Sequence, residues 1–487
     1  MSQILAGVAH TTDSKVLCDL PQVQFTVITS LGKTITKTVK LRDDGSIDGK
    51  SDLNLYDGTG KRHTVTSAQS FADLLPTLTS NQALMYGVFN DPADLVRIYT
   101  DKKYVLLPVK TGKAARTNEC THYPTAPAIL AIDYDPPDGT PPITPDALAA
   151  AIGQHVPLGQ TAHVIAHSAS SWLFEGDVQR VGQKGLRLYL FVQDGSDIVR
   201  AGKVLFDRLW LAGHGYHNIS DSGSLLKRTL ADAMMWQSSR LDYAAGASCT
   251  APLNQRRPIA QAYEGALLDT RKALPDLSDT ERAQLDAMIA DDKARLKPQA
   301  DAIRGVYATD LAKQQLTSNG VTEPTTAQID TVAKQVIQSL KGTVLPSDWL
   351  ITLHNGVRVT IADLYADPTK YHKQTCKDPI EPTYRNGATT GIIYTDSPDG
   401  VIRIVSQAHG LKTHTTCNQS TLEQPQQYSN QEIWDARSAY SAAVARYEEA
   451  DCDYLKTDKT DPQPTLALTD LEVIGAAFLL VLACTKV

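Results

Sequence analysis

Two aspartates at the end of an apolar segment are the residues of this chain best suited to chemistry. Asp133 and Asp135 close the run PAILAIDYD, residues 127–135, whose other members are all apolar or aromatic. Such a run is typical of a central strand buried on both faces, and alternate residues of a strand point to the same side. The two carboxylates should therefore converge, and such hard oxygen ligands bind the one or two Mg²⁺ or Mn²⁺ ions that nucleotidyl transfer requires. The alternative is a strand-end turn whose aspartates only cap the next element.

The strands expected after this pair bring further polar side chains toward it. Residues 162–171, AHVIAHSASS, predict a strand that runs into a hydroxyl-rich turn. Residues 185–193 alternate strictly, with three leucines and a valine on one side of the predicted strand and Arg187, Tyr189 and Phe191 on the other. The exposed or buried state of Tyr189 is left open, because its ring could equally stack on a base or pack in the core.

Helices are expected between these strands. Thr144 and Pro145 fit the N-cap and the first turn of one helix. Residues 196–213 predict a second, ending near Gly213, and residues 225–236 then bring basic and acidic side chains together before Trp236, which we interpret as a core residue. The order and lengths of these segments fit an RNA-recognition-like (RRM-like) split βαβ unit with the acids at one strand end.

Charge along the chain is compatible with a local nucleic-acid surface. The whole sequence of 487 residues carries 47 Lys and Arg against 54 Asp and Glu, a net charge of −7. Between Arg180 and Arg240, however, the sequence contains nine basic residues and five aspartates, a net charge of +4. A basic stretch beside paired carboxylates is a combination expected of a polymerase, since it can hold a triphosphate and a nucleic-acid backbone.

At this point the residues resemble a known family. The series AARTNECTHYPTAPAILAIDYDPPDG, then HSASS, then KGLRLYLFVQDGSDIVRAGKVLFDRLWLAGHGYHNI and LLKRTLADAMMWQSSRLDYAAGA is similar to the catalytic core of the archaeo-eukaryotic primase superfamily. The closest likeness is to the primase-polymerases of phages, plasmids and integrated elements. The resemblance covers most of residues 80–415.

The resemblance assigns roles to individual residues. It implies that Asp133 and Asp135 are the metal-binding pair and that Arg187 stands where the family usually has a nucleotide-contacting histidine. It also implies a third metal-binding acid, for which Asp232 is preferred and Asp221 and Asp242 are alternatives. The expected nucleotide-binding residues are Ser168, Ser170, Ser171, Lys184, Arg187 and Arg228.

The implied activity is that of a DNA primase-polymerase, a nucleotidyltransferase with Mg²⁺ or Mn²⁺ as cofactor. Single-stranded DNA would be the template and NTP or dNTP the substrate, in the replication of a phage or another mobile element. A separate replicative helicase is the expected partner, because Gly58-Thr59-Gly60-Lys61 lacks the spacing of a phosphate-binding ATPase loop. Two alternatives stay open: a catalytically inactive replication-initiation or single-stranded-DNA-binding protein on the same scaffold, and a metal-dependent nuclease.

The expected fold class is α+β, in five parts. They are a β-rich N-terminal part (1–115), the RRM-like catalytic core (116–260), a helical connector (261–345), a small β-rich accessory α/β module (346–418) and a helical tail (419–487). In the connector, Ser278 and Glu281 form a capping box, Pro298 is expected to interrupt the first helix and Gly342 to end the second.

The remaining features indicate a cytoplasmic protein without a membrane partner. The first residues carry no basic start followed by a long apolar run, so a secretory signal is not expected. The seven cysteines are scattered, which favours reduced thiols. The apolar stretch 473–484 is shorter than the ~20 residues of a membrane helix. Asp378, Glu381 and His409 are interpreted as turn caps and a sheet-edge histidine.

Overall fold

The computed structural model describes residues 20–50, 55, 57–137, 139–342, 344–408 and 412–418. The chain forms two compact units, residues 1–345 with 350–416 and residues 346–349 with 417–487. Every helix and strand given below belongs to the first unit. The expected tail helix, the apolar stretch 473–484 and His409 lie outside the described residues. The architecture is mixed α+β with several small sheets, which confirms the expected class.

A five-stranded sheet dominates the N-terminal part, in the order β5-β1-β4-β7-β8. Its strands are β1 (Val23–Ser30), β4 (Asp57–Val65), β5 (Gln82–Met85), β7 (Leu95–Tyr99) and β8 (Lys113–Ala115). Small pairings add β2 (Thr38–Leu41), β3 (Ile47–Lys50) and β17 (Ser248–Cys249) in one sheet, and β6 (Val88–Phe89) with β9 (Thr121–His122) in another. The helices are α1 (Ala68–Leu74), which starts with a capping box at Ser67, and α2 (Asp101–Val105).

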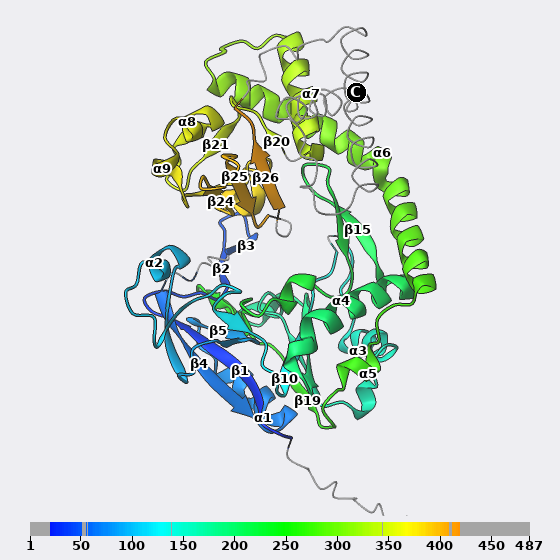
Figure 1. Ribbon diagram of the computed structural model, residues 1–487. Coiled ribbons are helices and arrows are strands. Elements are labelled where there is room, and N and C mark those ends of the chain that lie inside the picture. Colours follow the sequence, from blue (N-terminus) through cyan, green and yellow to red (C-terminus); the bar gives the residue numbers. More distant parts are fainter. Residues whose placement is uncertain are drawn as a thin grey trace, which may run out of the picture. The chain divides into compact units, whose positions relative to one another are not determined.

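The central sheet has four antiparallel strands in the order β10-β14-β11-β19. These are β10 (Ala128–Tyr134), β11 (His163–His167), β14 (Leu186–Val192) and β19 (Gln261–Tyr263). Helix α3 (Pro145–Gly153) connects β10 to β11, and α4 (Ile198–Leu209) follows β14 (Figure 1). In the sheet, β14 therefore lies between β10 and β11, although it follows both in sequence. A helix follows β10 and another follows β14.

Local signals in the sequence explain these elements. The Thr144 side chain accepts a hydrogen bond from the Ala147 N–H and caps α3 as expected, and Gly213 takes the positive φ of 83° that ends the helical segment after α4. The leucines and the valine of β14 are fully buried. Phe71 of α1 makes edge-to-face contacts with both Tyr189 and Phe191, so α1 covers the face of β14 that also carries Arg187.

The segment after α4 returns to β10. Trp236 is buried, as expected, and its indole N–H donates to the Ala131 carbonyl at 3.0 Å. Gly202 of α4 lies against the same indole, where a Cβ would come within 2.2 Å of a ring carbon. The helix, the indole and the sheet thus share one core.

The same part of the chain contains two further small sheets. They are formed by β12 (Leu173–Glu175), β13 (Val178–Val181) and β18 (Leu253–Gln255), and by the hairpin of β15 (Tyr216–Ile219) and β16 (Leu225–Arg228). The connector contains α5 (Thr270–Ala273), α6 (Asp279–Ser318) and α7 (Thr326–Gly342). The capping box at Ser278 and Glu281 and the end of α7 agree with expectation.

The expected interruption at Pro298 is wrong, because α6 is a single helix of 40 residues that contains Pro298. A proline removes one backbone N–H, and the residues on both sides of Pro298 are mostly strong helix formers. The loss of one hydrogen bond is therefore not enough to end this helix.

The C-terminal elements of the first unit form another five-stranded sheet, β20-β26-β25-β24-β23. Its strands are β20 (Val344–Leu345), β23 (Thr375–Cys376), β24 (Gly391–Tyr394), β25 (Arg403–Ser406) and β26 (Lys412–Thr416), with β21 (Leu350–Thr352) and β22 (Arg358–Thr360) as a separate pair. The helices here are α8 (Ile361–Ala366), α9 (Pro368–Tyr371) and α10 (Tyr384–Gly387). Within the described ranges, no helix is long and apolar enough to span a bilayer.

Candidate functional site

The centre of the site is an ion pair across two strands. Asp133 at the end of β10 lies directly opposite Arg187 of β14, and the Arg187 Nη1 donates to the Asp133 Oδ1. The side chains are 12% and 14% exposed, so the pair is largely withdrawn from solvent. The register of the sheet, which the alternation in residues 185–193 sets, places the guanidinium and the carboxylate on one face.

A second carboxylate holds the other side of the guanidinium. The Arg187 Nε donates to the Asp242 Oδ1 at 3.2 Å. The Asp242 Oδ2 accepts from the hydroxyl of Tyr86 at 2.6 Å and from that of Tyr189 at 2.9 Å. The Asp242 side chain is 0% exposed, and a buried carboxylate needs such a full set of donors. Of the two roles open to Tyr189, the structure shows the buried one, in which its hydroxyl supports Asp242.

Burial and crowding of carboxylates set the electrostatics of the pair. Burial raises the pKa of Asp133 well above its ordinary value. The guanidinium of Arg187 opposes this, whereas the neighbouring carboxylates of Asp135, Asp242 and Asp232 raise the same pKa further. Asp133 is therefore a group whose charge depends on a cation nearby.

Asp135 and the serine turn meet at Gly185. A Cβ on Gly185 would lie 2.6 Å from the Asp135 Oδ1 and 3.1 Å from the Ser168 Oγ, so only glycine fits between them. The Ser168 hydroxyl lies 3.0 Å from that of Ser170 and 3.1 Å from that of Ser171. The predicted hydroxyl turn therefore forms, and it lies beside Asp135.

Two lysines lie near Asp135. Lys184 is exposed, and its backbone N–H donates to the Ser171 Oγ at 2.9 Å. Lys37 comes from the N-terminal part of the chain: burial lowers its pKa, the charge of Lys184 lowers it further, and Asp135 raises it. Lys37 was not predicted, and no local pattern in residues 33–40 distinguishes it from the other lysines there.

The candidates for a third acid occupy different places. The Asp232 backbone N–H donates to the Asp133 carbonyl at 3.0 Å, and its carboxylate caps the following turn through the Met234 N–H. Asp242 is committed to Arg187, and Asp221 is an exposed residue of the turn between β15 and β16. Of the three, Asp232 adjoins the aspartate pair without being bonded to Arg187.

The donor chemistry fits a hard cation, but the observed arrangement is not a finished metal site. Asp133 and Asp135 offer carboxylate oxygens of the kind that Mg²⁺ and Mn²⁺ prefer. Among the residues that the structure describes, however, no group of three or more His, Cys, Asp or Glu side chains is placed to hold a metal ion. Arg187 occupies one of the oxygens that such an ion would use.

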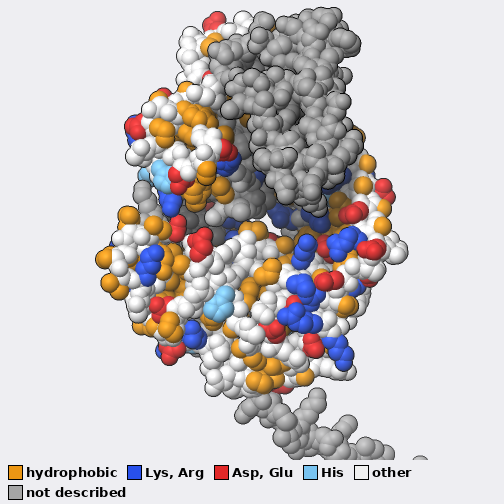
Figure 2. All heavy atoms as spheres, in the orientation of Figure 1, with side chains coloured by type: hydrophobic (Ala, Val, Ile, Leu, Met, Phe, Trp, Pro, Cys, Tyr) orange, Lys and Arg blue, Asp and Glu red, His pale blue; other side chains and the backbone are white. Residues whose placement is uncertain are grey.

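The basic stretch around the site is largely neutralised. Five of its nine basic residues pair with carboxylates, namely Arg180, Arg187, Arg200, Arg208 and Lys227. Acidic side chains accordingly lie among the basic ones over the region of α4 and β15 (Figure 2). Arg228 ends β16, and within the described chain no hydrogen bond or ion pair joins it to the serine turn or the aspartates.

A cavity of about 620 Å³ adjoins Arg187 and the serine turn. His167, Ser168, Arg187, Tyr189 and Arg257 are among its lining residues. The Arg257 Nη1 donates to the carbonyls of His167 and Ala244 at 3.1 and 3.2 Å. The volume is within the range of small-molecule sites and is large enough for a nucleotide.

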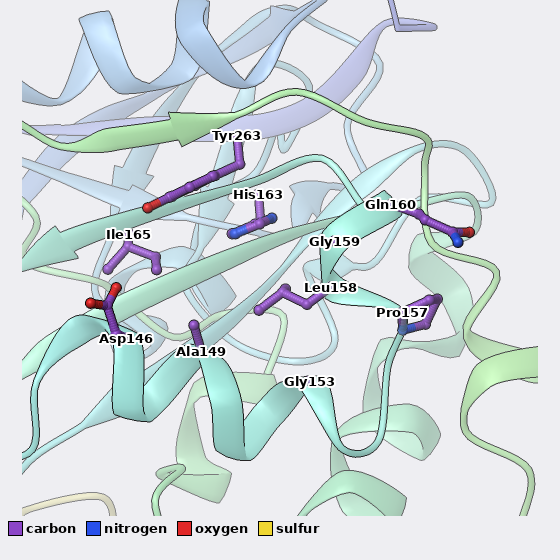
Figure 3. Close-up of a pocket in the computed structure, with 10 residues that line it drawn as sticks. All are labelled: Asp146, Ala149, Gly153, Pro157, Leu158, Gly159, Gln160, His163, Ile165 and Tyr263. Carbon is purple, nitrogen blue, oxygen red and sulfur yellow. The ribbon is translucent and has the colours of Figure 1, made fainter.

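A second cavity, of about 550 Å³, lies on the opposite face of the central sheet. Figure 3 shows Asp146 and Ala149 of α3 facing His163, Ile165 and Tyr263. His163 stacks on Tyr263 with ring centroids 4.5 Å apart. Alternation along β11 directs His163 and Ile165 away from the face that carries Arg187, so this cavity is separate from the site.

Comparisons of the chain with protein-family models, with curated proteins and with solved structures found no match in any of the three.

Proposed function

We propose that this chain is a primase-polymerase that carries out metal-dependent, template-directed nucleotidyl transfer on single-stranded DNA. The observation that carries the proposal is the convergence of Asp133, Asp135, the serine turn and Arg187 at one edge of the central sheet, beside the 620 Å³ cavity. The strand order β10-β14-β11, with helices after the first and third strands, supports an RRM-like split βαβ core.

In this proposal the aspartates bind the metal ion, and the serines and lysines bind the phosphates. Asp133, Asp135 and Asp232 would hold Mg²⁺ or Mn²⁺, which supplies a Lewis acid for the attacking hydroxyl and the leaving phosphate. Ser168 and Ser170 offer hydroxyl donors, and Lys184 with Lys37 offers positive charge, to the phosphates of an NTP or dNTP. Ser171, expected as a third donor, is 0% exposed and instead supports the turn, since its hydroxyl accepts from the Lys184 N–H. Arg257 and His167 would border the rest of the nucleotide in the cavity.

Primer synthesis or extension on single-stranded DNA with Mg²⁺ or Mn²⁺ tests this function. The variant in which Asp133→Asn and Asp135→Asn are combined should lose synthesis by a factor of at least about 10³, since charge stabilisation by a metal contributes several kcal/mol. Asp177→Asn, at an exposed carboxylate paired with Arg256, is the matched control and should retain wild-type synthesis. Wild-type synthesis by the double variant would refute the proposal, and strand cleavage in place of extension would indicate a nuclease.

A second candidate is a DNA-binding protein of replication initiation that keeps this scaffold without catalysis. The specific observation in its favour is that Arg187 engages the carboxylate that catalysis would need for a metal ion. Binding of single-stranded DNA without metal-dependent incorporation of nucleotides would favour this candidate.

A further inference from the structure

Arg187 joins two carboxylates that differ in their exposure to solvent. Its Nε donates to Asp242, whose side chain is 0% exposed, and its Nη1 donates to Asp133, whose side chain is 12% exposed at the strand end. One guanidinium therefore connects a fully enclosed acid with the acid on which metal binding depends.

The Asp242 side of this connection is fixed. Tyr86 and Tyr189 both donate to the Asp242 carboxylate, and the Asp242 backbone exchanges two hydrogen bonds with Leu84, at 2.8 and 2.9 Å. Arg187 can leave Asp242 only by stranding a buried charge, which is costly. The contact with Asp133 is the one that can open, because that carboxylate is the more exposed of the two, at 12% against 0%.

A divalent cation and the guanidinium cannot share the Asp133 carboxylate without strong repulsion between their charges. A triphosphate can relieve this conflict, because a guanidinium binds phosphate oxygens in the same bidentate manner as it binds a carboxylate. The same cavity is lined by Arg187 and by Ser168 of the serine turn, so phosphates bound in it could contact the guanidinium.

We propose that Arg187 gates metal loading: it occupies Asp133 while no nucleotide is bound and releases it when a nucleoside triphosphate takes over the guanidinium. This inference rests on the proposed function, because it assumes that Asp133 and Asp135 bind a metal ion. Its consequence is positive coupling between metal and nucleotide, each of which increases the affinity of the other by the same factor.

The test is a titration of the full chain with Mn²⁺, in which free Mn²⁺ is measured by electron paramagnetic resonance. It is done alone and with a non-hydrolysable α,β-imido nucleoside triphosphate, and the additional Mn²⁺ bound by the analogue itself is subtracted. The analogue should tighten Mn²⁺ binding by the wild type by on the order of tenfold or more. Arg187→Met should bind Mn²⁺ tightly without the analogue, roughly tenfold better than the wild type, and should gain little from it.

Three further variants control for a nonspecific loss of positive charge, for misfolding and for Mn²⁺ binding elsewhere. Arg256→Met removes a half-exposed guanidinium that pairs with Asp177 and does not line the cavity, so it should leave Mn²⁺ affinity close to that of the wild type. Arg187→Lys keeps a cation for Asp242 but cannot reach both acids, and it replaces Arg187→Met if that variant does not fold. Adding Asp133→Asn and Asp135→Asn to Arg187→Met should remove the tight Mn²⁺ site.

The results separate the gate from the polymerase. Equal Mn²⁺ affinity of the wild type and the Arg187 variants without nucleotide would overturn the gate. So would a gain in Mn²⁺ affinity in Arg256→Met that equals the gain in Arg187→Met. Tight Mn²⁺ binding by Arg187→Met in a protein that never synthesises DNA would uphold the gate and refute the polymerase. If the wild type synthesises DNA but its Mn²⁺ affinity does not change when the analogue is added, the polymerase is upheld and the gate is refuted.

Discussion

Tyr86 and Tyr189 should make the stability of this protein sensitive to alkaline pH. Burial raises the pKa of both phenols well above the ordinary value of 10.0, and the charge of Asp242 raises each of them further. Above pH 10 the unfolded chain therefore loses these protons while the folded chain keeps them. Stability that is complete below pH 10 should fall as the pH rises, by up to about 1.4 kcal/mol per pH unit for each tyrosine.

Urea unfolding at a series of pH values from 8 to 11 measures this effect. The variant in which Tyr86→Phe and Tyr189→Phe are combined should be less stable near neutral pH and should show a shallower alkaline decline. Tyr263→Phe changes a hydroxyl on the exposed edge strand β19 and should follow the wild-type profile. Equal alkaline slopes in the double variant and the wild type would contradict the assignment.

The sequence predicted some of these residues and not others, for a physical reason. Asp133, Asp135 and Arg187 could be placed because the alternation of a strand orients side chains within a few residues. Asp242 and Tyr86 are 156 positions apart in the chain and meet only through tertiary structure. Asp242 was therefore considered only as a metal ligand, and its role as the anchor of Arg187 has no local signature.

At the scale of elements, the site depends on a close approach between strand ends and the serine turn. Gly185 is the point of contact: besides the carboxylate of Asp135, a Cβ there would meet the Tyr134 carbonyl at 2.7 Å. Gly185→Ala should therefore separate β10 from β14 at the site and cost about 1–3 kcal/mol of folding free energy, as overpacking of a tight interior does. The proposed DNA synthesis should also fall, even at temperatures where the variant remains folded, because the serines and Asp135 move apart.

Thermal unfolding together with primer extension measures both effects. Gly182→Ala is the matched control three residues earlier, where a Cβ would meet only the flexible side chain of Gln179. It should change stability by less than about 0.5 kcal/mol. A Gly185→Ala protein with wild-type stability and synthesis would show that the close approach is not needed.

Elements were predictable where their signals are local. The N-cap of α3, the alternation of β14 and the stop at Gly213 all act within a few residues, and each matches the structure. Pro298 is the counterexample, because the continuation of α6 depends on its neighbours over many turns. The cavity beside Arg187 could not be predicted either, since it is built from four separate regions of sequence.

At the scale of the whole molecule, the local excess of positive charge is smaller than the sequence suggests. Most of the basic residues between Arg180 and Arg240 are paired with carboxylates, some of them from outside that stretch, such as Glu175 and Glu281. Free positive charge near the aspartates comes instead from Lys184 and from Lys37 of the N-terminal part. Net charge counted along a segment therefore overestimates the charge available to a phosphate backbone.

Glu381 connects the central part of the chain with the C-terminal sheet. Asp378 is a turn cap, as expected, because it accepts from the N–H groups of Ile380 and Glu381. Glu381 has another role: it is 4% exposed, and its Oε1 accepts from the Ser220 hydroxyl at 2.9 Å and from the Ser222 N–H at 3.2 Å. The turn between β15 and β16 is thereby bonded to a segment about 160 residues away.

Removal of the Glu381 carboxylate should loosen this connection. Glu381→Ala leaves the two buried serine donors without their acceptor, which should cost about 1–3 kcal/mol, whereas Glu381→Gln keeps an acceptor oxygen and should cost less. Urea unfolding measures the loss, and faster proteolysis after residue 345 would show where it acts. Arg403→Ala, which removes an exposed ion pair with Asp399 in the same sheet, should cost less than about 1 kcal/mol. If Glu381→Ala matched Arg403→Ala in both measurements, the bonds to the β15–β16 turn would not be what holds the C-terminal sheet to the rest of the unit.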